Sequence, residues 1–158
     1  MPISLLLLSL LPADDKKDPN AADRQRLQGT WITSYLVNDG KTIIDSKTPA
    51  KGPETKLVYE ADKWLIKVGD KTVASGVFTI DATKSLKEID ILDGSGKIND
   101  KTRRGIYTVD GDVYKYCLAK TGDPRPTDFT ADKGSSRSLG LMKRGKSKKP
   151  DPKETPKP

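Results

Sequence analysis

Between residues 27 and 144, apolar side chains recur mostly at every second position, and Gly, Pro, Asn and Asp interrupt the runs. A spacing of two is typical of β-strands with one buried face, whereas an amphipathic helix repeats every three to four residues. The pattern predicts eight strands, at residues 30–37, 56–60, 63–68, 72–80, 86–92, 105–110, 113–119 and 138–144. Only residues 21–28 fit a helix, a short one that ends before Gly29.

Short turns connect the predicted strands. Asp110-Gly111 lies between two of them and is a strong hairpin signal, because a type I′ turn needs positive φ at both central residues. Short connections favour antiparallel neighbours, since parallel strands need long crossovers. A meander of eight strands hides its edges by closing on itself. We therefore expect an all-β fold, an antiparallel eight-stranded up-and-down barrel over residues 27–144 with disordered termini.

The hairpin around Asp110-Gly111 indicates which side chains point inward. Whether its turn comprises residues 110–111 or 111–112, the same face carries Tyr107, Val109, Tyr114, Tyr116 and Leu118. This face is the more apolar one and should line the interior. Tyr107 and Tyr116 are therefore candidate ligand-binding residues. Cys117 is on the opposite face, either exposed or beneath a loop, and we expect it to be structural or incidental.

The N-terminus has the pattern of a secretory signal. Residues 3–11 are apolar apart from Ser4 and Ser9, Ala13 is a small residue before a cleavage point, and a polar stretch follows. The run is too short to span a membrane, so no transmembrane anchor is expected. No Lys or Arg precedes Ile3, which leaves a second interpretation, an apolar arm that packs on a cytoplasmic domain. We expect residues 1–13 to be a signal peptide of an exported protein, periplasmic or secreted, and residues 14–26 to be a polar linker or short helix.

The net charge of +7 is concentrated at the C-terminus. Residues 143–158 carry seven basic and two acidic side chains, and four prolines follow Ser147. Residues 145–158 therefore predict a disordered basic tail. Its lysines could bind an anionic polymer, or the tail could simply be solvated. The lysines concerned are Lys146, Lys148, Lys149, Lys153 and Lys157. No aromatic residue is interleaved for base stacking, so sequence-specific nucleic-acid binding is not expected.

The composition excludes several chemistries. The chain has no histidine and a single cysteine, Cys117, which rules out Ser-His-Asp and Cys-His catalysis, histidine-ligated zinc and an internal disulfide. Residues 93–100 resemble a calcium loop, but Lys97 and Ile98 stand where an oxygen ligand and a glycine are needed. Glu88 and Asp90 alternate with isoleucines, as on a solvent-facing strand. We therefore expect no enzyme activity, no cofactor and no metal.

A loop with two prolines contains further candidate residues. Arg125 is stiffened by the prolines on both sides, and Asp128 and Phe129 follow it. Arg125 could bind an anionic group at the barrel mouth, because its planar fork matches a carboxylate or phosphate. Alternatively, Arg125 pairs with Asp128 or with strand-end carbonyls while Phe129 caps the core. Both interpretations are open from the sequence.

The first and last strands carry a family resemblance. The Gly-x-Trp pattern of Gly29 and Trp31, together with Arg144 at the end of the last strand, resembles lipocalin-like barrels, in which a tryptophan and a basic residue close one barrel end. A longer series resembles an uncharacterised family of planctomycete domains that follow a signal peptide. It comprises LQGTW at 27–31, GIY at 105–107, DGD at 110–112, YCL at 116–118, RPTDF at 125–129 and KR at 143–144. The resemblance implies export and a barrel, and implies no activity.

Two functions are consistent with these features. The first is a non-catalytic barrel, expected to be a monomer, that binds a small apolar or amphipathic ligand or acts as an interaction module in the cell envelope. The second is attachment to a polyanion, such as a cell-wall polymer or nucleic acid, through the basic tail. An eight-stranded barrel can hold one small ligand or be filled by its own side chains. The sequence does not choose between these.

Overall fold

The computed structural model describes residues 18–48, 52–94 and 101–146. In these ranges one helix, α1 (Ala21–Leu27), precedes nine strands. The strands are β1 (Gly29–Asn38), β2 (Lys41–Asp45), β3 (Thr55–Glu60), β4 (Lys63–Val68), β5 (Lys71–Asp81), β6 (Glu88–Asp93), β7 (Arg103–Asp110), β8 (Val113–Leu118) and β9 (Ser138–Arg144).

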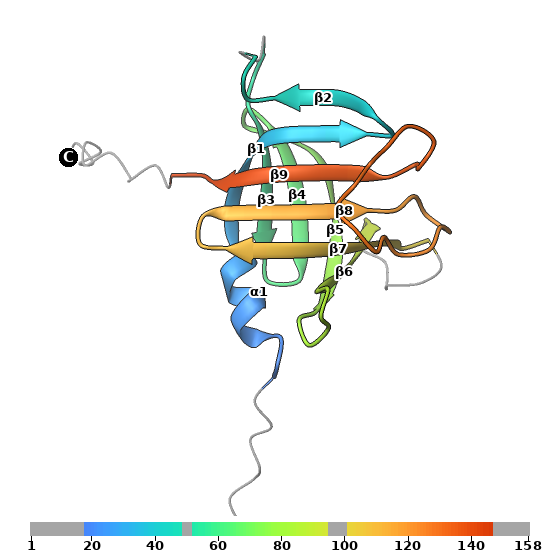
Figure 1. Ribbon diagram of the computed structural model, residues 1–158. Coiled ribbons are helices and arrows are strands. Elements are labelled where there is room, and N and C mark those ends of the chain that lie inside the picture. Colours follow the sequence, from blue (N-terminus) through green and yellow to red (C-terminus); the bar gives the residue numbers. More distant parts are fainter. Residues whose placement is uncertain (1–17, 49–51, 95–100, 147–158) are drawn as a thin grey trace, which may run out of the picture.

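Eight of these strands form a closed antiparallel barrel (Figure 1). Strands β3 to β9 pair in sequence order, and β1 pairs with β3 along one edge and with β9 along the other. Closure leaves none of the eight with a free edge along its whole length. The predicted eight-stranded up-and-down barrel is confirmed, because each predicted segment overlaps one barrel strand.

Strand β2 was not predicted from the sequence. On one edge of β1 the N-terminal half pairs with β3 and the C-terminal half pairs with β2 from Tyr35 to Asn38, while the other edge stays paired with β9 as far as Asn38. Asp39 and Gly40 form the turn with φ of 49° and 77°, and a type I′ hairpin requires two positive values. Strand β2 therefore flanks the barrel beside β1 (Figure 1).

The β7–β8 hairpin turns at Gly111 and Asp112, the second of the two registers considered. Of these two residues only Gly111 has a positive φ, 52°. The turn is therefore not of the type I′ that the Asp-Gly pair indicated. Tyr107 lies opposite Tyr116 across the hairpin, and the face that carries both points into the barrel, as predicted.

Aromatic and branched side chains fill most of the interior. They include Trp31, Leu57, Tyr59, Trp64, Phe78, Ile80, Ile89, Tyr107, Val109, Tyr114, Leu118 and Met142. The hydroxyls of Tyr59 and Tyr114 share a hydrogen bond of 2.8 Å, which satisfies two buried polar groups. Burial raises the pKa of both phenols, so they stay neutral.

Helix α1 lies at the barrel end where β1 begins (Figure 1). Its last residue, Leu27, is completely buried. Gln28 then exchanges two hydrogen bonds with Ala61 in the β3–β4 turn: the Ala61 N–H donates to Oε1 at 2.7 Å, and Nε2 donates to the Ala61 carbonyl at 3.1 Å. These contacts fix the helix to one end of the barrel.

The loop between β8 and β9 covers part of the outer barrel surface. Ile106 and Cys117 are neighbours on the outward face of β7 and β8, yet both are almost completely buried. The Cys117 thiol donates to the carbonyl of Thr130 at 3.2 Å, and Pro126 in the same loop is also buried. The chain thus forms a second, small apolar layer outside the barrel.

Candidate functional site

A cavity of about 120 Å³ lies in the half of the barrel away from α1. Most of its wall is apolar, and its polar residues are Thr33, Thr55, Lys56, Tyr59, Asp93, Arg103 and Tyr116. The apolar wall comprises Leu36, Leu57, Trp64, Ile66, Ile91, Leu118 and Met142. The barrel is therefore packed at the helix end and hollow toward the opposite end, where β7 begins and β6 ends.

Tyr116 supplies the phenol of this cavity. Its ring crosses the backbone of Gly140, its partner on β9, and a Cβ at that position would lie 2.4 Å from ring atoms. The ring also contacts Tyr114, with centroids 5.7 Å apart. Burial raises the pKa of Tyr116 to about 12, so its hydroxyl is a hydrogen-bond donor at neutral pH. No residue in the described part of the chain forms a hydrogen bond with this hydroxyl.

Arg103 brings a positive charge to the same cavity. It is the first residue of β7, and its cross-strand partner Ile91 also lines the cavity. Its Nε donates to the carbonyl of Ala119 at 3.3 Å, and one Nη donates to Ser138 Oγ at 3.1 Å. The charge of Arg103 acts on Tyr116, where it opposes the effect of burial on the phenol pKa. The two polar groups therefore belong to one electrostatic environment.

The closed end of the barrel contains Trp31 and Arg144. The two residues are direct partners across β1 and β9, and the guanidinium lies 4.2 Å from the indole centroid. Arg144 also donates to the carbonyls of Gln28 at 3.0 Å and Arg26 at 2.7 Å. Gly29, just before Trp31, has a φ of 102° and lies against the same guanidinium. The contacts of Arg144 with Trp31, Gln28 and Arg26 therefore close this end of the barrel.

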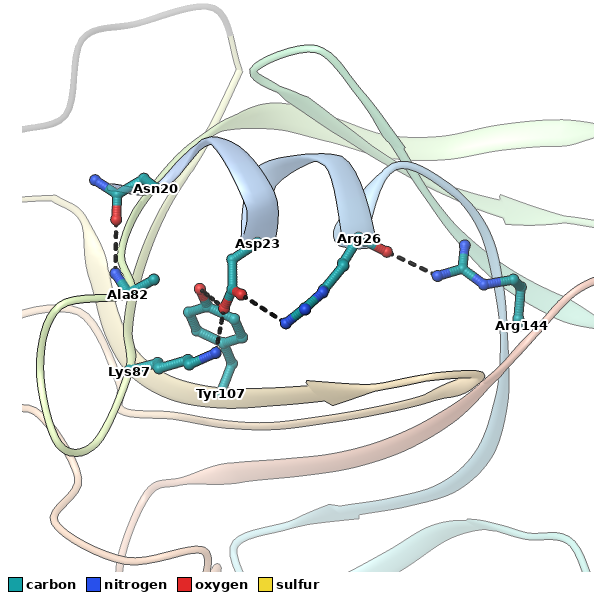
Figure 2. A network of polar contacts seen from close by, with 7 residues as sticks. All are labelled: Asn20, Asp23, Arg26, Ala82, Lys87, Tyr107 and Arg144. Atoms are coloured by element: carbon teal, nitrogen blue, oxygen red, sulfur yellow. Dashed lines mark hydrogen bonds and ion pairs between the residues drawn. The ribbon is translucent and has the colours of Figure 1, made fainter. Parts of the chain in front are cut away.

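A buried carboxylate joins α1 to the barrel (Figure 2). Asp23 accepts a hydrogen bond from Tyr107 Oη at 2.9 Å and pairs with Lys87 Nζ at 2.6 Å and with Arg26 at 3.4 Å. Burial alone would raise the pKa of Asp23, but the hydrogen bonds from Lys87 and Tyr107 and the neighbouring positive charges outweigh it and hold the pKa below its usual value. Asn20 Oδ1 accepts from the Ala82 N–H at 2.7 Å on the same side.

This network corrects the expectation for Tyr107 as a ligand-binding residue. Its hydroxyl is committed to Asp23, the side chain is completely buried, and it is absent from the cavity wall. Tyr116, which lies directly opposite Tyr107 across the hairpin, does line the cavity. The two tyrosines share a face but serve different ends of the barrel.

Arg125 lies on the outer surface of the barrel. It pairs with Asp90 at 2.7 Å and Glu88 at 3.4 Å, and it donates to the carbonyls of Gly105 and Ile89 at 2.6 and 3.2 Å. Of the two interpretations of Arg125, its contacts therefore agree with pairing to backbone carbonyls. Its two acidic partners, Glu88 and Asp90, were not indicated by the sequence. Arg125 holds the β8–β9 loop on β6 and β7, away from the cavity.

Asp128 and Phe129 are also outside the cavity. Asp128 accepts hydrogen bonds from the backbone and hydroxyl of Thr130 and pairs with Arg137 at 3.2 Å; the Thr130 hydroxyl bond above all holds the pKa of this carboxyl below its usual value. Phe129 lies under the Lys115 ammonium, 4.7 Å from the ring centroid. Phe129 therefore packs on an outward-facing side chain and does not cap the core, which corrects that expectation. The placement of Arg125, Asp128 and Phe129 outside the cavity likewise does not support the expectation that they bind a ligand there.

Several predicted features lie outside the described residues. They are the signal over 1–13, most of the segment 93–100, and Lys148, Lys149, Lys153 and Lys157 of the tail. Lys146 is described and exposed. Within the described ranges no group of three or more acidic or sulfur ligands is placed to hold a metal ion, and no helix is long and apolar enough to cross a membrane.

The cavity contains a residue that sequence reasoning missed. Arg103 precedes Gly105 and Tyr107 at a spacing of two, so it belongs to the same inward-facing set on β7. Extending the alternation two positions before Gly105 would have found it. The predicted strand began at residue 105, which left Arg103 outside the pattern.

No family model, curated protein or solved structure matches this chain. The resemblance to the planctomycete domain family therefore stays a prediction. The case for a function depends on the geometry of the cavity alone.

Proposed function

We propose that this protein is a non-catalytic binding protein that holds one small, mainly apolar ligand inside its barrel. The observation that carries the proposal is the cavity of about 120 Å³ whose wall includes Trp64 and Met142. Folded interiors are close-packed, so a hollow of this size next to a densely packed aromatic core is a specific feature of the barrel. Its wall is mostly apolar, which favours an apolar ligand body.

The size of the cavity limits the ligand. Apolar cavities of about 150 Å³ are able to bind benzene. This cavity, at about 120 Å³, is somewhat smaller, so one ring or a short branched chain is the largest ligand body that it suits, and a long acyl chain or a sterol is too large for the described space. Binding would remove the ligand and the wall from water, at about 25 cal/mol per Å² of apolar surface.

The proposal that the protein is non-catalytic is supported by the chemistry of the wall. Asp93 is the one carboxylate that lines the cavity, and it is exposed. The raised pKa of Tyr116 keeps its phenol protonated at neutral pH, so it is a poor general base. The lining thus offers binding groups without a matched acid–base pair.

Export is part of the same proposal and is supported by the sequence of residues 1–13 alone. A mature chain that begins at Asp14 would retain the whole barrel and α1. N-terminal sequencing of the protein from its own host tests this. A protein that retains residues 1–13 in the cytoplasm would contradict it.

A neutral apolar probe tests the binding function directly. Toluene, titrated into the full chain, should shift amide NMR signals of the cavity wall. Ile91→Phe fills the cavity from β6 and should weaken toluene binding at least tenfold. Val73→Phe adds the same ring at an exposed position and should leave binding unchanged.

The binding proposal is judged by which amide signals toluene shifts and by the difference in toluene affinity between Ile91→Phe and Val73→Phe. If toluene shifts no wall residue, or if Ile91→Phe and Val73→Phe bind it equally, the cavity is not a binding site. Both variants should keep a single unfolding transition, measured by circular dichroism, so that a loss of binding is not a loss of fold.

We propose polyanion attachment as a second candidate function. Lys143 and Lys146 are exposed at the end of β9 and form no ion pair within the described part of the chain. They continue into the basic sequence that follows. Salt-sensitive binding to an anionic polymer, abolished by deletion of residues 145–158, is the expected result. Equal binding by the full and truncated chains would contradict it.

A further inference from the structure

Arg103 differs from most of the described arginines in having no acidic partner among the described residues. Five other arginines each lie within 4.0 Å of a carboxylate: Arg24, Arg26, Arg125, Arg137 and Arg144. Arg103 is partly buried in the cavity wall, and its two hydrogen bonds go to neutral oxygens of Ala119 and Ser138. A guanidinium has five N–H donors, so part of its capacity is unused here.

The Tyr116 hydroxyl is a second unused donor on the same wall. It forms no hydrogen bond with the described residues, whereas the hydroxyls of Tyr59, Tyr107 and Tyr114 all have partners. The Tyr116 ring is fixed between Gly140 and Tyr114, so the direction of its hydroxyl is set by the barrel. A mostly apolar cavity thus presents one guanidinium with unused donors and one neutral phenol donor, whereas the other cation on its wall, Lys56, lies 3.4 Å from the Glu54 carboxylate.

We propose that the cavity binds small monocarboxylates with a compact apolar body, whose carboxylate is held by Arg103 and Tyr116. The inference rests on the proposed binding function and specifies its ligand class. A planar carboxylate suits the fork of a guanidinium, and a phenol can donate to a second lone pair. The apolar body then lies against Leu57, Ile66 and Met142 deeper in the barrel.

The charge of the site favours a monoanion over a dianion such as phosphate. Arg103 is the one cation on the wall that has no acidic partner among the described residues, because Lys56 lies 3.4 Å from Glu54, and Asp93 places a negative charge at the same cavity. A second negative charge on the ligand would have no partner there and would be repelled by Asp93. For the same reason, Asp93→Asn should strengthen carboxylate binding a few-fold.

Benzoate and toluene form a matched pair of probes for the test. They share a ring of the appropriate size and differ in the carboxylate. Both are titrated by NMR into the full chain, Arg103→Gln, Tyr116→Phe and Arg104→Gln. Arg104 is the neighbouring residue, exposed on the opposite face of β7, so Arg104→Gln makes the same charge change without touching the cavity.

The expected result separates the carboxylate from the ring. Benzoate should bind at least tenfold more weakly to Arg103→Gln and several-fold more weakly to Tyr116→Phe, with Arg104→Gln like the native protein. Toluene should bind Arg103→Gln and the native protein alike, which also shows that the variant is folded.

Two outcomes would overturn the inference in different ways. If toluene binds and benzoate does not, or if Arg103→Gln and Arg104→Gln affect benzoate equally, the cavity binds apolar molecules without recognising a carboxylate. If neither probe binds in the cavity, the proposed function fails together with the ligand class. Inorganic phosphate, added as a third probe, should not bind; if it displaces benzoate, the preference for monoanions is wrong.

Discussion

Gly140 provides the space that the Tyr116 ring occupies on the cavity wall. A methyl group there would come within 2.4 Å of the ring, far inside van der Waals contact. We expect Gly140→Ala to displace Tyr116 and to lower the free energy of unfolding by about 1–3 kcal/mol, the usual cost of overpacking. Urea denaturation measures this change.

A double-mutant cycle isolates the contact between these two residues. In a Tyr116→Leu background the added methyl group meets a smaller, more flexible side chain. The cost of Gly140→Ala should then fall below about 1 kcal/mol. An equal cost in both backgrounds would show that the backbone of β9, and not the Tyr116 ring, sets the requirement for glycine.

Asp23 makes the stability of the protein sensitive to acid. Its pKa is lowered in the folded state, so its contribution is complete above the usual value of 3.8 and is lost as the pH falls through the folded-state pKa. At pH 7 we expect Asp23→Asn to cost about 1.5–3 kcal/mol, because Lys87 loses its charged partner. Urea denaturation at pH 7 and at successive values below 3.8 should show the difference between native and variant proteins shrinking.

Asp132→Asn is the control for this pH dependence, because it makes the same charge change at an exposed position. Its difference from the native protein should be small at every pH. A difference for Asp23→Asn that stays constant down to the lowest pH would mean that the ion pair with Lys87 does not stabilise the fold.

At the scale of elements, the eight barrel strands could be predicted from the sequence. The features that were not, strand β2 and the type of the β7–β8 turn, have physical reasons. The same Asp-Gly signal that located the β7–β8 hairpin also stands at Asp39-Gly40, where it forms a true type I′ turn. This signal did not lead to a predicted hairpin, because residues 41–45 form a mostly exposed strand without an inward face and therefore lack the alternation of apolar residues. Strand β2 pairs with β1 alone, and burial patterns do not reveal such a flanking strand.

The positions of loop residues were the least predictable part of the site. Arg125 is bound to Asp90 and Glu88, some 35 positions earlier, and nothing in the local sequence of its loop indicates those partners. Strand periodicity places a residue on a face, as for Tyr116, but a loop crosses the barrel surface without such a rule. The inward-facing strand residues are therefore the ones from which the site could be predicted.

Helix α1 depends on Arg144 at the end of the last strand. Arg144 donates to two carbonyls at the helix C-terminus and stacks on Trp31. We expect Arg144→Gln to lower the free energy of unfolding by about 1–3 kcal/mol and to speed hydrogen exchange of the α1 amides. Lys143→Gln removes the same charge from an exposed neighbour and should change neither quantity. Equal exchange in the two variants would contradict this role of Arg144.

At the scale of the whole molecule, closure of the barrel joins the two ends of the described chain. Ser34 Oγ on β1 donates to the Leu141 carbonyl on β9, 107 positions away, and Trp31 lies opposite Arg144. Until β1 meets β9, each of these two strands has an unpaired edge. The barrel should therefore behave as one cooperative unit, although its cavity leaves one half less densely packed.

This cooperativity predicts both the equilibrium and the kinetics of folding. Unfolding by urea should give the same midpoint from the fluorescence of Trp31 and Trp64, which report opposite halves of the barrel, and from far-UV circular dichroism. Refolding should take milliseconds to seconds, because contacts as distant as those of β1 and β9 require a costly loop closure. Stopped-flow fluorescence measures the rate, and Trp31→Phe and Trp64→Phe isolate each half. If the Trp64 signal is lost at lower urea than the Trp31 signal, the half with the cavity unfolds independently, and the barrel is not a single unit.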